Sequence, residues 1–253
     1  MQNDNAATES RNNSNGTDYL EIARHCDFNV GSAIKHLWNA RRNLALAFPK
    51  DTVENPAPPV CQEPAKAEAA DGVYLILKGG AAIPFDPENK PKPDDNYIAV
   101  GLKMGSKRIA VALHDFQDGD GNKDVTLTTQ KSEKDYGGYK DNYLDAGADW
   151  DGKGNTEHLK KNGLNAAIKL EPGQWIPSLA ELKFVHLFRK EVNEALEFAG
   201  GDKLDPYWYW SSTEYSATYA WYLNLNDGYA NGGTKAAGQG RVRPVSAFLP
   251  LNL

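Results

Sequence analysis

The segment from Tyr215 to Gly240 contains the residue types best suited to chemistry, and that chemistry is non-covalent recognition. It is rich in Tyr, Asn, Gly, Ala, Ser and Thr, and its only charged residues are Asp227 and Lys235. Antibody binding loops use similar residues, because Tyr supplies rigid contact area while Ser, Gly and Asn supply adaptable hydrogen bonds. We therefore expect a ligand-binding surface. Its predicted contact residues are Tyr215, Tyr219, Tyr222, Asn224, Asn226, Asp227, Tyr229, Asn231, Thr234 and Gln239.

The stretch "AWYLNLNDG" within this segment has the alternation of a half-buried strand followed by an Asp-Gly turn. One face of the expected strand holds Trp221, Leu223 and Leu225, and the other holds Tyr222, Asn224 and Asn226. The first set is predicted to be core and the second to face a ligand. The four tyrosines of the surface are the expected anchors, since a few aromatic residues usually dominate interface energies at roughly 2 kcal/mol or more each. The asparagines and Asp227 would add directional polar contacts.

Metal chemistry is suggested at one place, the acidic stretch "DFQDGDGNKD". Asp118, Asp120, Asn122 and Asp124 alternate as calcium ligands do, but Lys123 stands where the loop needs glycine and Thr129 where it needs glutamate. We favour an acidic turn between strands and expect no bound metal.

Catalytic chemistry finds little support in the remaining residues. The five histidines are scattered, and there is no HExxH, no GxSxG and no phosphate-binding glycine loop. The two cysteines, Cys26 and Cys61, lie in the first quarter of the chain without CxxC spacing and are expected to be reduced thiols. We expect neither enzymatic activity nor a cofactor.

The overall composition excludes further classes. The chain has 253 residues and a net charge of −6, which argues against nucleic-acid binding. No secretory signal pattern and no apolar run of membrane-spanning length is visible. The expectation is therefore a protein without membrane insertion that is cytoplasmic or carried on a phage particle.

Four regions follow from the composition along the chain. Residues 1–17 are polar and predicted to be a disordered tail, 18–48 a short helical module, and 49–71 a Pro/Ala-rich linker. Residues 72–253 are expected to form the ligand-binding domain, with its variable segment at about 207–241. Two short helices bury little surface alone, so the helical module is predicted to bind a carrier or a copy of itself.

The domain is expected to mix strands with a few helices, which makes the fold class α+β. The runs "VYLILK", "YIAVGLK", "RIAVALHDF" and "DVTLTT" are predicted strands, with "MGSK" as a tight hairpin. One helix is expected along the stripe Tyr139, Tyr143, Ala146 and Trp150. Another should begin at Ser178, with Glu181 completing a capping box, and end at Gly200-Gly201.

Three ordered motifs, "GQWIPSLAELKFV", "WYWSSTEYSATYAW" and "RVRPVSAF", resemble the variable proteins of diversity-generating retroelements from gut bacteria and their prophages. The resemblance covers roughly residues 72–248 and implies a C-type-lectin-like fold. It also implies that an error-prone copy of a template, altered at adenines, rewrites the surface residues. The N-terminal "FNVGSAIKHLWNA" resembles a short helical motif of phage proteins related to nucleotide kinases; kinase activity is not transferred with it.

The codon AAC offers a check on this resemblance. Replacing its adenines yields Tyr, Asn, Asp, Ser, Thr, Gly and Ala among other residues, and never Lys, Glu, Gln or a stop. All predicted contact residues except Gln239 belong to this set, and Gln239 needs a different starting codon. Turn composition alone explains Asn, Asp and Gly. The four tyrosines are harder to explain in that way.

Alternatives remain open at this point. Formylglycine-generating enzymes have a similar scaffold, but they need two reactive cysteines in the domain, and none follows Cys61. A structural phage or envelope component is a further option. Arg241 and Arg243 are expected to form ion pairs beneath the binding face, with Glu214 as a partner. The tryptophans expected in the core are Trp175, Trp208, Trp210 and Trp221.

Overall fold

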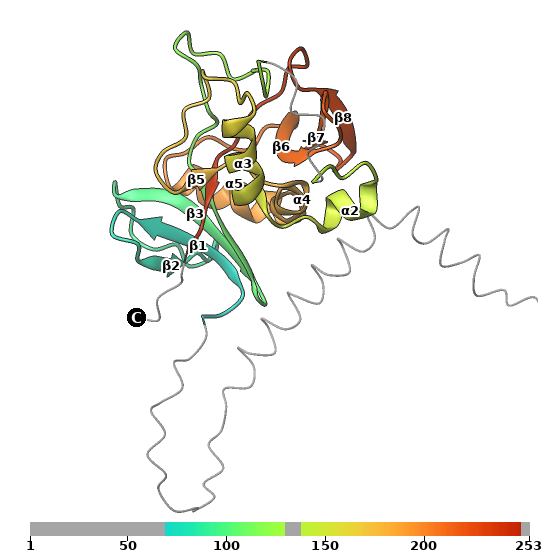
Figure 1. The fold of residues 1–253 in the computed structure, drawn as a ribbon. Coiled ribbons are helices and arrows are strands. Elements are labelled where there is room, and N and C mark those ends of the chain that lie inside the picture. Colours follow the sequence, from blue (N-terminus) through green and yellow to red (C-terminus); the bar gives the residue numbers. More distant parts are fainter. Residues whose placement is uncertain (1–68, 130–137, 249–253) are drawn as a thin grey trace, which may run out of the picture. The chain divides into compact units, whose positions relative to one another are not determined.

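The computed structural model describes residues 69–129 and 138–248 (Figure 1). The predicted tail, the helical module and the linker up to residue 68 lie outside this part of the chain. Within it, helices and antiparallel strands are combined, so the predicted α+β class is confirmed. None of the helices in the described residues has the length and apolar character needed to span a bilayer.

The larger sheet has six strands in the order β2-β1-β3-β4-β9-β5, all paired antiparallel. Its strands are β1 (Gly72–Leu77), β2 (Ala82–Pro84), β3 (Tyr97–Met104), β4 (Lys107–Ala112), β5 (Gln174–Trp175) and β9 (Val245–Ser246). The predicted hairpin is confirmed, because Met104 pairs with Lys107 and Gly105 adopts φ 56° at the first turn position. Through β9, the end of the chain joins the strands that begin the domain.

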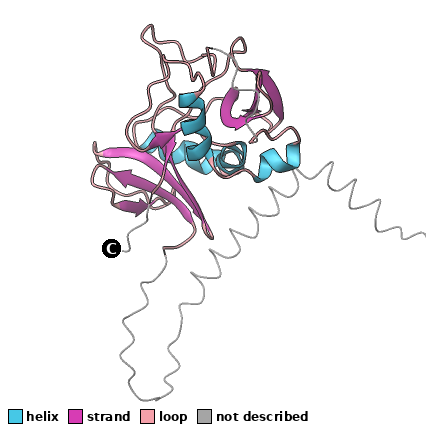
Figure 2. Ribbon diagram, in the orientation of Figure 1, coloured by secondary structure: helices cyan, strands magenta, loops and turns pink. Residues whose placement is uncertain are grey.

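The smaller sheet has three antiparallel strands in the order β6-β7-β8. They are β6 (Trp208–Glu214), β7 (Tyr219–Asn224) and β8 (Ala230–Thr234). Figure 2 shows the helices between this sheet and the larger one. The smaller sheet therefore carries most of the segment predicted to bind ligand, and β8 is one of its two edge strands.

The helices are α2 (Tyr143–Ala148), α3 (Gly152–Lys161), α4 (Leu179–Leu187) and α5 (Arg189–Phe198). The capping box at Ser178 is confirmed: its Oγ accepts the Glu181 N–H at 3.3 Å, and the Glu181 carboxylate accepts the Ser178 N–H at 2.8 Å. The single helix expected up to Gly200 is wrong. Phe188 leaves helical geometry at φ −112° and ψ 21°, and it divides the segment into α4 and α5. The break lets α4 pack on β6 and β7 while α5 packs on β1 and β3.

Two further expectations are corrected. The helix predicted along Tyr139–Trp150 covers only Tyr143–Ala148, because Asn142 caps its start and the chain becomes extended at Asp149. The strand predicted over residues 124–129 is an irregular segment with bends at Leu127 and Thr129 and two isolated bridges, Val125–Gly240 and Thr128–Leu164. Its apolar side chains are buried as expected, but within the described residues no neighbouring strand runs along its length.

Buried charges tie the two sheets to the segments between them. The guanidinium of Arg243 is buried and donates to Asp115 at 2.6 Å and to the carbonyl oxygens of Ala112 and Leu113 at 3.0 and 2.8 Å. Glu214 does not pair with Arg241 or Arg243 as expected; its partner is the buried ammonium of Lys235. Arg241 and Arg243 pair with other carboxylates because β6 directs Glu214 toward the end of β8.

Candidate ligand-binding surface

The smaller sheet presents two different faces, and β7 decides which residues belong to each. Trp221 and Leu223 are buried, whereas Tyr222 and Asn224 are partly exposed. This alternation was predicted. Residues paired directly across an antiparallel ladder share a face, so Gly232 joins Trp221 and Asn231 joins Tyr222. The predicted contact residues are therefore divided between two faces.

The first face carries four aromatic rings, which we call the aromatic cage: Tyr143, Tyr215, Tyr219 and Trp221. The ring of Tyr215 lies 5.3 Å from that of Trp221 and 6.4 Å from that of Tyr219, and Tyr143 lies 6.2 Å from Trp221. Each of these three contacts is edge-to-face, with interplanar angles of 62° to 72°. The planes of neighbouring rings are therefore steeply inclined to one another.

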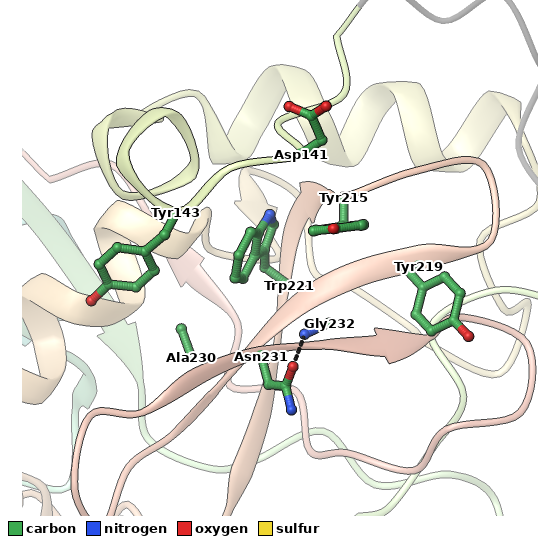
Figure 3. A pocket seen from close by; sticks show the side chains of 8 residues that line it. All are labelled: Asp141, Tyr143, Tyr215, Tyr219, Trp221, Ala230, Asn231 and Gly232. Carbon is green, nitrogen blue, oxygen red and sulfur yellow. Dashed lines mark hydrogen bonds between the residues drawn. The ribbon is translucent and has the colours of Figure 1, made fainter.

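The aromatic cage lines a pocket of about 490 Å³ (Figure 3). Figure 3 shows Trp221 between Tyr143 and Tyr215, with Tyr219 beyond Tyr215 and Asp141 above them. The remaining lining residues are Ala230, Asn231 and Gly232 of the edge strand β8, where Asn231 shares the face of Tyr222 and lines the pocket from the sheet edge. The Asn231 side-chain oxygen accepts the Gly232 N–H at 2.8 Å. This bond satisfies a backbone donor that the sheet edge would otherwise present.

The second face carries a stacked aromatic cluster, formed by Trp208, Trp210, Tyr222 and Tyr229. The ring of Tyr222 stacks on Trp208 at 4.1 Å and 24° and on Trp210 at 5.3 Å and 27°. Tyr229 meets Trp208 edge-on at 6.1 Å. Tyr222 thus stacks on two tryptophans, and it packs against the hydrophobic core around Trp210. Tyr222 supports the sheet, and Tyr229 is exposed.

The turn between β7 and β8 uses the predicted polar contact residues for its own structure. The Asn224 side-chain oxygen accepts the Asn226 N–H at 2.9 Å, and the Asp227 carboxylate accepts the Tyr229 N–H at 3.0 Å. Gly228 takes φ 79°, which favours glycine. Asn226 and Asp227 are exposed and Asn224 is partly exposed. Each of these side chains keeps further polar capacity for a ligand.

The last two predicted contact residues are Thr234, the half-buried final residue of β8, and Gln239, which is exposed in the loop after it. Lys235 lies between them and is buried against Glu214. Burial lowers the pKa of the Lys235 ammonium, and the bond to Glu214 opposes that shift. His158 Nε2 lies 3.3 Å from the other Glu214 carboxylate oxygen. This charged group anchors the ends of β6 and β8 beneath the surface.

Five of the lining residues were not predicted as contact residues: Asp141, Tyr143, Trp221, Ala230 and Gly232. Asp141 and Tyr143 precede the variable segment by many residues, and Tyr143 of α2 reaches it through its ring contact with Trp221. The predicted core role is confirmed for Trp175, Trp210 and Trp221, which are buried. Trp208 is half-buried. The sequence feature that could have indicated this part of the site was an aromatic residue, Tyr143, within a polar stretch.

No candidate metal cluster of three or more His, Cys, Asp or Glu residues exists in the described part of the chain. The Asp118 carboxylate accepts backbone N–H groups of Asp120 and Asn122 at 2.9 and 2.8 Å, and the Asn122 side chain adds a third bond. The bonds from Asn122 lower the pKa of Asp118. The carboxylate therefore organises its own turn.

Comparison with known proteins yields a likeness of fold alone. No family model matches the chain, and no curated protein matches it. A solved structure described as a fimbrial protein from Bacteroides ovatus ATCC 8483 is similar, with a TM-score of 0.54 at 15% identity. The alignment covers 71% of this chain and 49% of that one, so this chain spans about half the length of the fimbrial protein.

Proposed function

We propose that the protein is a receptor-like binding protein whose ligand contacts the β6-β7-β8 sheet and its connecting turns. The observation that carries the proposal is the exposure of Tyr215, Tyr219 and Tyr229, at 37%, 42% and 58%, above buried strands. Large aromatic side chains left in water at neighbouring positions mark interaction sites. Tyrosine suits this role because it offers contact area at low entropic cost.

Diversification by a retroelement is the finer part of this proposal. Trp221 and Lys235 cannot arise from an AAC codon by adenine replacement, and both are buried. Gln239 cannot arise that way either and is exposed, so its position needs another template codon. Most positions with AAC-accessible residues are exposed or partly exposed. This division favours a constant framework that carries changeable surface residues.

A C-type-lectin-like framework is part of the same proposal. The two antiparallel sheets with short helices between them are compatible with such a scaffold. The ligand would be a protein or a surface glycan, and the N-terminal helical module would hold the domain on a carrier or a second copy. No catalytic step is proposed.

A structural fimbrial or envelope subunit is the second candidate, and the likeness to the fimbrial protein favours it. The two candidates differ in what the exposed tyrosines do. A purely structural subunit would keep every interaction of its particle or cell when Tyr215, Tyr219 and Tyr229 are replaced by alanine. A receptor-like protein would lose its ligand.

The test begins with the DNA of the locus. We expect a reverse transcriptase gene and a near-copy of the last hundred or so bases, with mismatches confined to template adenines. Mismatches spread over other bases would contradict diversification.

A display library provides the matched experiment for binding. Randomising Tyr215, Tyr219, Asn226, Tyr229 and Asn231 to AAC-accessible residues should leave folding intact and yield binders to a panel of protein baits. A control library at the same number of buried positions of β6 and β7 should lose folded protein. Failure of the first library to yield any binder would contradict the receptor-like role.

A further inference from the structure

We propose that the pocket of the aromatic cage binds an organic cation, such as the ammonium group of a lysine side chain or a quaternary ammonium group. The proposal rests on the proposed function, since it names the ligand chemistry of the same surface. It goes further in assigning part of that chemistry to residues that diversification would not change: Asp141 and Trp221.

The first argument is the orientation of the rings. Cations bind against the faces of aromatic rings, and sites for ammonium groups surround the cation with several rings at angles to one another. Tyr215 crosses Trp221 at 64° and Tyr219 at 72°. Rings crossed in this way can direct faces toward one open pocket, whereas parallel rings cover one another.

The second argument is the polar inventory of the pocket. The Trp221 indole N–H is already donated to the Lys140 carbonyl oxygen at 2.6 Å, and the Tyr143 hydroxyl is bonded to Lys183. The indole N–H is therefore engaged within the protein, and the Tyr143 hydroxyl oxygen already accepts from a cation. Asp141 is exposed and forms no ion pair within the described residues. A pocket that offers a carboxylate and aromatic rings favours a cation over an anion.

The protein itself uses this kind of contact next to the pocket. The Lys183 ammonium lies 3.8 Å from the ring centroid of Tyr143. Because that ring already holds a cation, the rings of Tyr215, Tyr219 and Trp221 are the principal walls for a ligand.

The pocket thus has a constant and a changeable part. Asp141 and Tyr143 precede the variable segment, and Trp221 cannot arise from AAC. Tyr215, Tyr219, Asn231 and Gly232 belong to the AAC-accessible set. The constant part would give every variant a preference for cationic groups, and the changeable part would select among the molecules that carry them.

The test uses the full chain and two probes of nearly equal shape, choline and its neutral carbon analogue 3,3-dimethylbutan-1-ol. Binding is followed by the NMR signal of the Trp221 indole N–H, assigned with Trp221→Phe. We expect choline to bind roughly fivefold or more tightly than the neutral analogue, since cation–π contacts at exposed sites and a nearby carboxylate both favour the charge. Equal affinities, or absence of binding by choline, would overturn the proposal.

Two charge variants provide the matched control. Asp141→Asn should weaken choline binding roughly threefold, the size of an exposed charge contact, and leave the neutral analogue unchanged. Asp95→Asn removes the same charge from an exposed position before β3, outside the pocket, and should change the affinity of neither probe. An unchanged choline affinity in Asp141→Asn would contradict the assignment of the carboxylate.

Two tyrosine variants separate this inference from the proposed function. Tyr219→Ala should weaken choline binding, and Tyr207→Ala, at an exposed tyrosine outside the pocket, should not. N-acetyl-lysine N-methylamide is the third probe. Tighter binding of this probe than of choline would identify a lysine ammonium group as the ligand, and tighter binding of choline would identify a quaternary ammonium group. If both cations fail while the display library yields binders, the cation site is wrong and the receptor-like role stands. If the library yields no binder while choline binds, the receptor-like role is wrong and the cation site stands.

Discussion

The two faces of the β6-β7-β8 sheet are built from the same aromatic residue types in opposite geometries. On one face, Tyr222 lies at 24° and 27° to two tryptophans, so its ring is covered. On the other, Tyr215 stands at 64° and 72° to its neighbours beside an open pocket. A tyrosine stacked parallel to its neighbours contributes to the packing of the sheet, whereas a tyrosine crossed with its neighbours remains available to a ligand.

The two faces differ in which of their tyrosines can be replaced without loss of stability. Tyr215, Tyr219 and Tyr229 can be replaced without emptying the core, because each is substantially exposed. Tyr222 has the same predicted origin in an AAC codon, yet it is stacked between Trp208 and Trp210. We expect its replacements to be limited by packing, and four predictions test this difference.

The largest effect is expected beneath both faces, at Lys235→Ala. The substitution leaves the buried Glu214 carboxylate without its ammonium partner, and such a loss costs about 3–5 kcal/mol of unfolding free energy. Urea unfolding of the full chain measures it. Replacing both residues with Met should recover most of the loss, since an apolar pair removes the uncompensated charge. Equal destabilisation by the single and double variants would argue against a buried ion pair.

The second prediction compares tyrosines of the two faces directly. Tyr222→Ala should cost about 2 kcal/mol, because it removes a half-buried ring and two stacked contacts. Tyr219→Ala should stay within about 0.5 kcal/mol, as exposed substitutions do. The measurement is the melting temperature of each variant, determined by thermal unfolding under the same conditions. Similar melting temperatures would remove the distinction between support and surface.

The third prediction compares the packing of the two faces at two adjacent glycines of β8, Gly232 and Gly233. A Cβ added at Gly233 would lie 2.7 Å from the Trp210 ring, whereas one at Gly232 would meet nothing closer than 3.8 Å. Gly233→Ala should therefore destabilise by about 1–3 kcal/mol through overpacking. Gly232→Ala should have little effect on stability. Chemical denaturation of both is the measurement, and a neutral Gly233→Ala would show that Trp210 can move.

The smallest effect concerns the helix beneath the cage side of the sheet. Burial raises the pKa of Glu181 from its ordinary 4.5 to about 6, although bonds from Ser178 and Trp175 oppose the shift. A raised carboxyl pKa stabilises the fold below pH 4.5, and that contribution disappears as the pH rises through 6. The loss amounts to about 2 kcal/mol at most.

Glu181→Gln removes this titration and keeps an acceptor oxygen for the capping box. The stability difference between wild type and variant should change by up to about 2 kcal/mol between pH 4 and pH 8, with the wild type losing relative stability at higher pH. Urea midpoints across that range measure it. A constant difference would mean that Glu181 titrates as an exposed carboxyl.

The sequence alone determined the local features whose causes lie within a few residues. The capping box at Ser178, the hairpin at Gly105 and the period-two alternation from Trp221 to Asn224 depend on backbone bonding and on burial of one face. The exposure of Tyr229 follows from its place just after the Asp-Gly turn. The exposure of Tyr219 does not follow from the alternation, because Tyr219 shares a face of β7 with the buried Trp221 and Leu223. These features give the α+β class and most of the candidate surface.

Only the tertiary structure decided which distant residues meet. The break at Phe188 depends on α4 and α5 packing against different sheets, which no local propensity encodes. The Glu214–Lys235 pair and the arrival of Asp141 and Tyr143 at the pocket depend on how β6, β8 and α2 come together. Ring orientation is likewise a packing outcome, because a tyrosine in a sequence carries no sign of whether its faces will be covered.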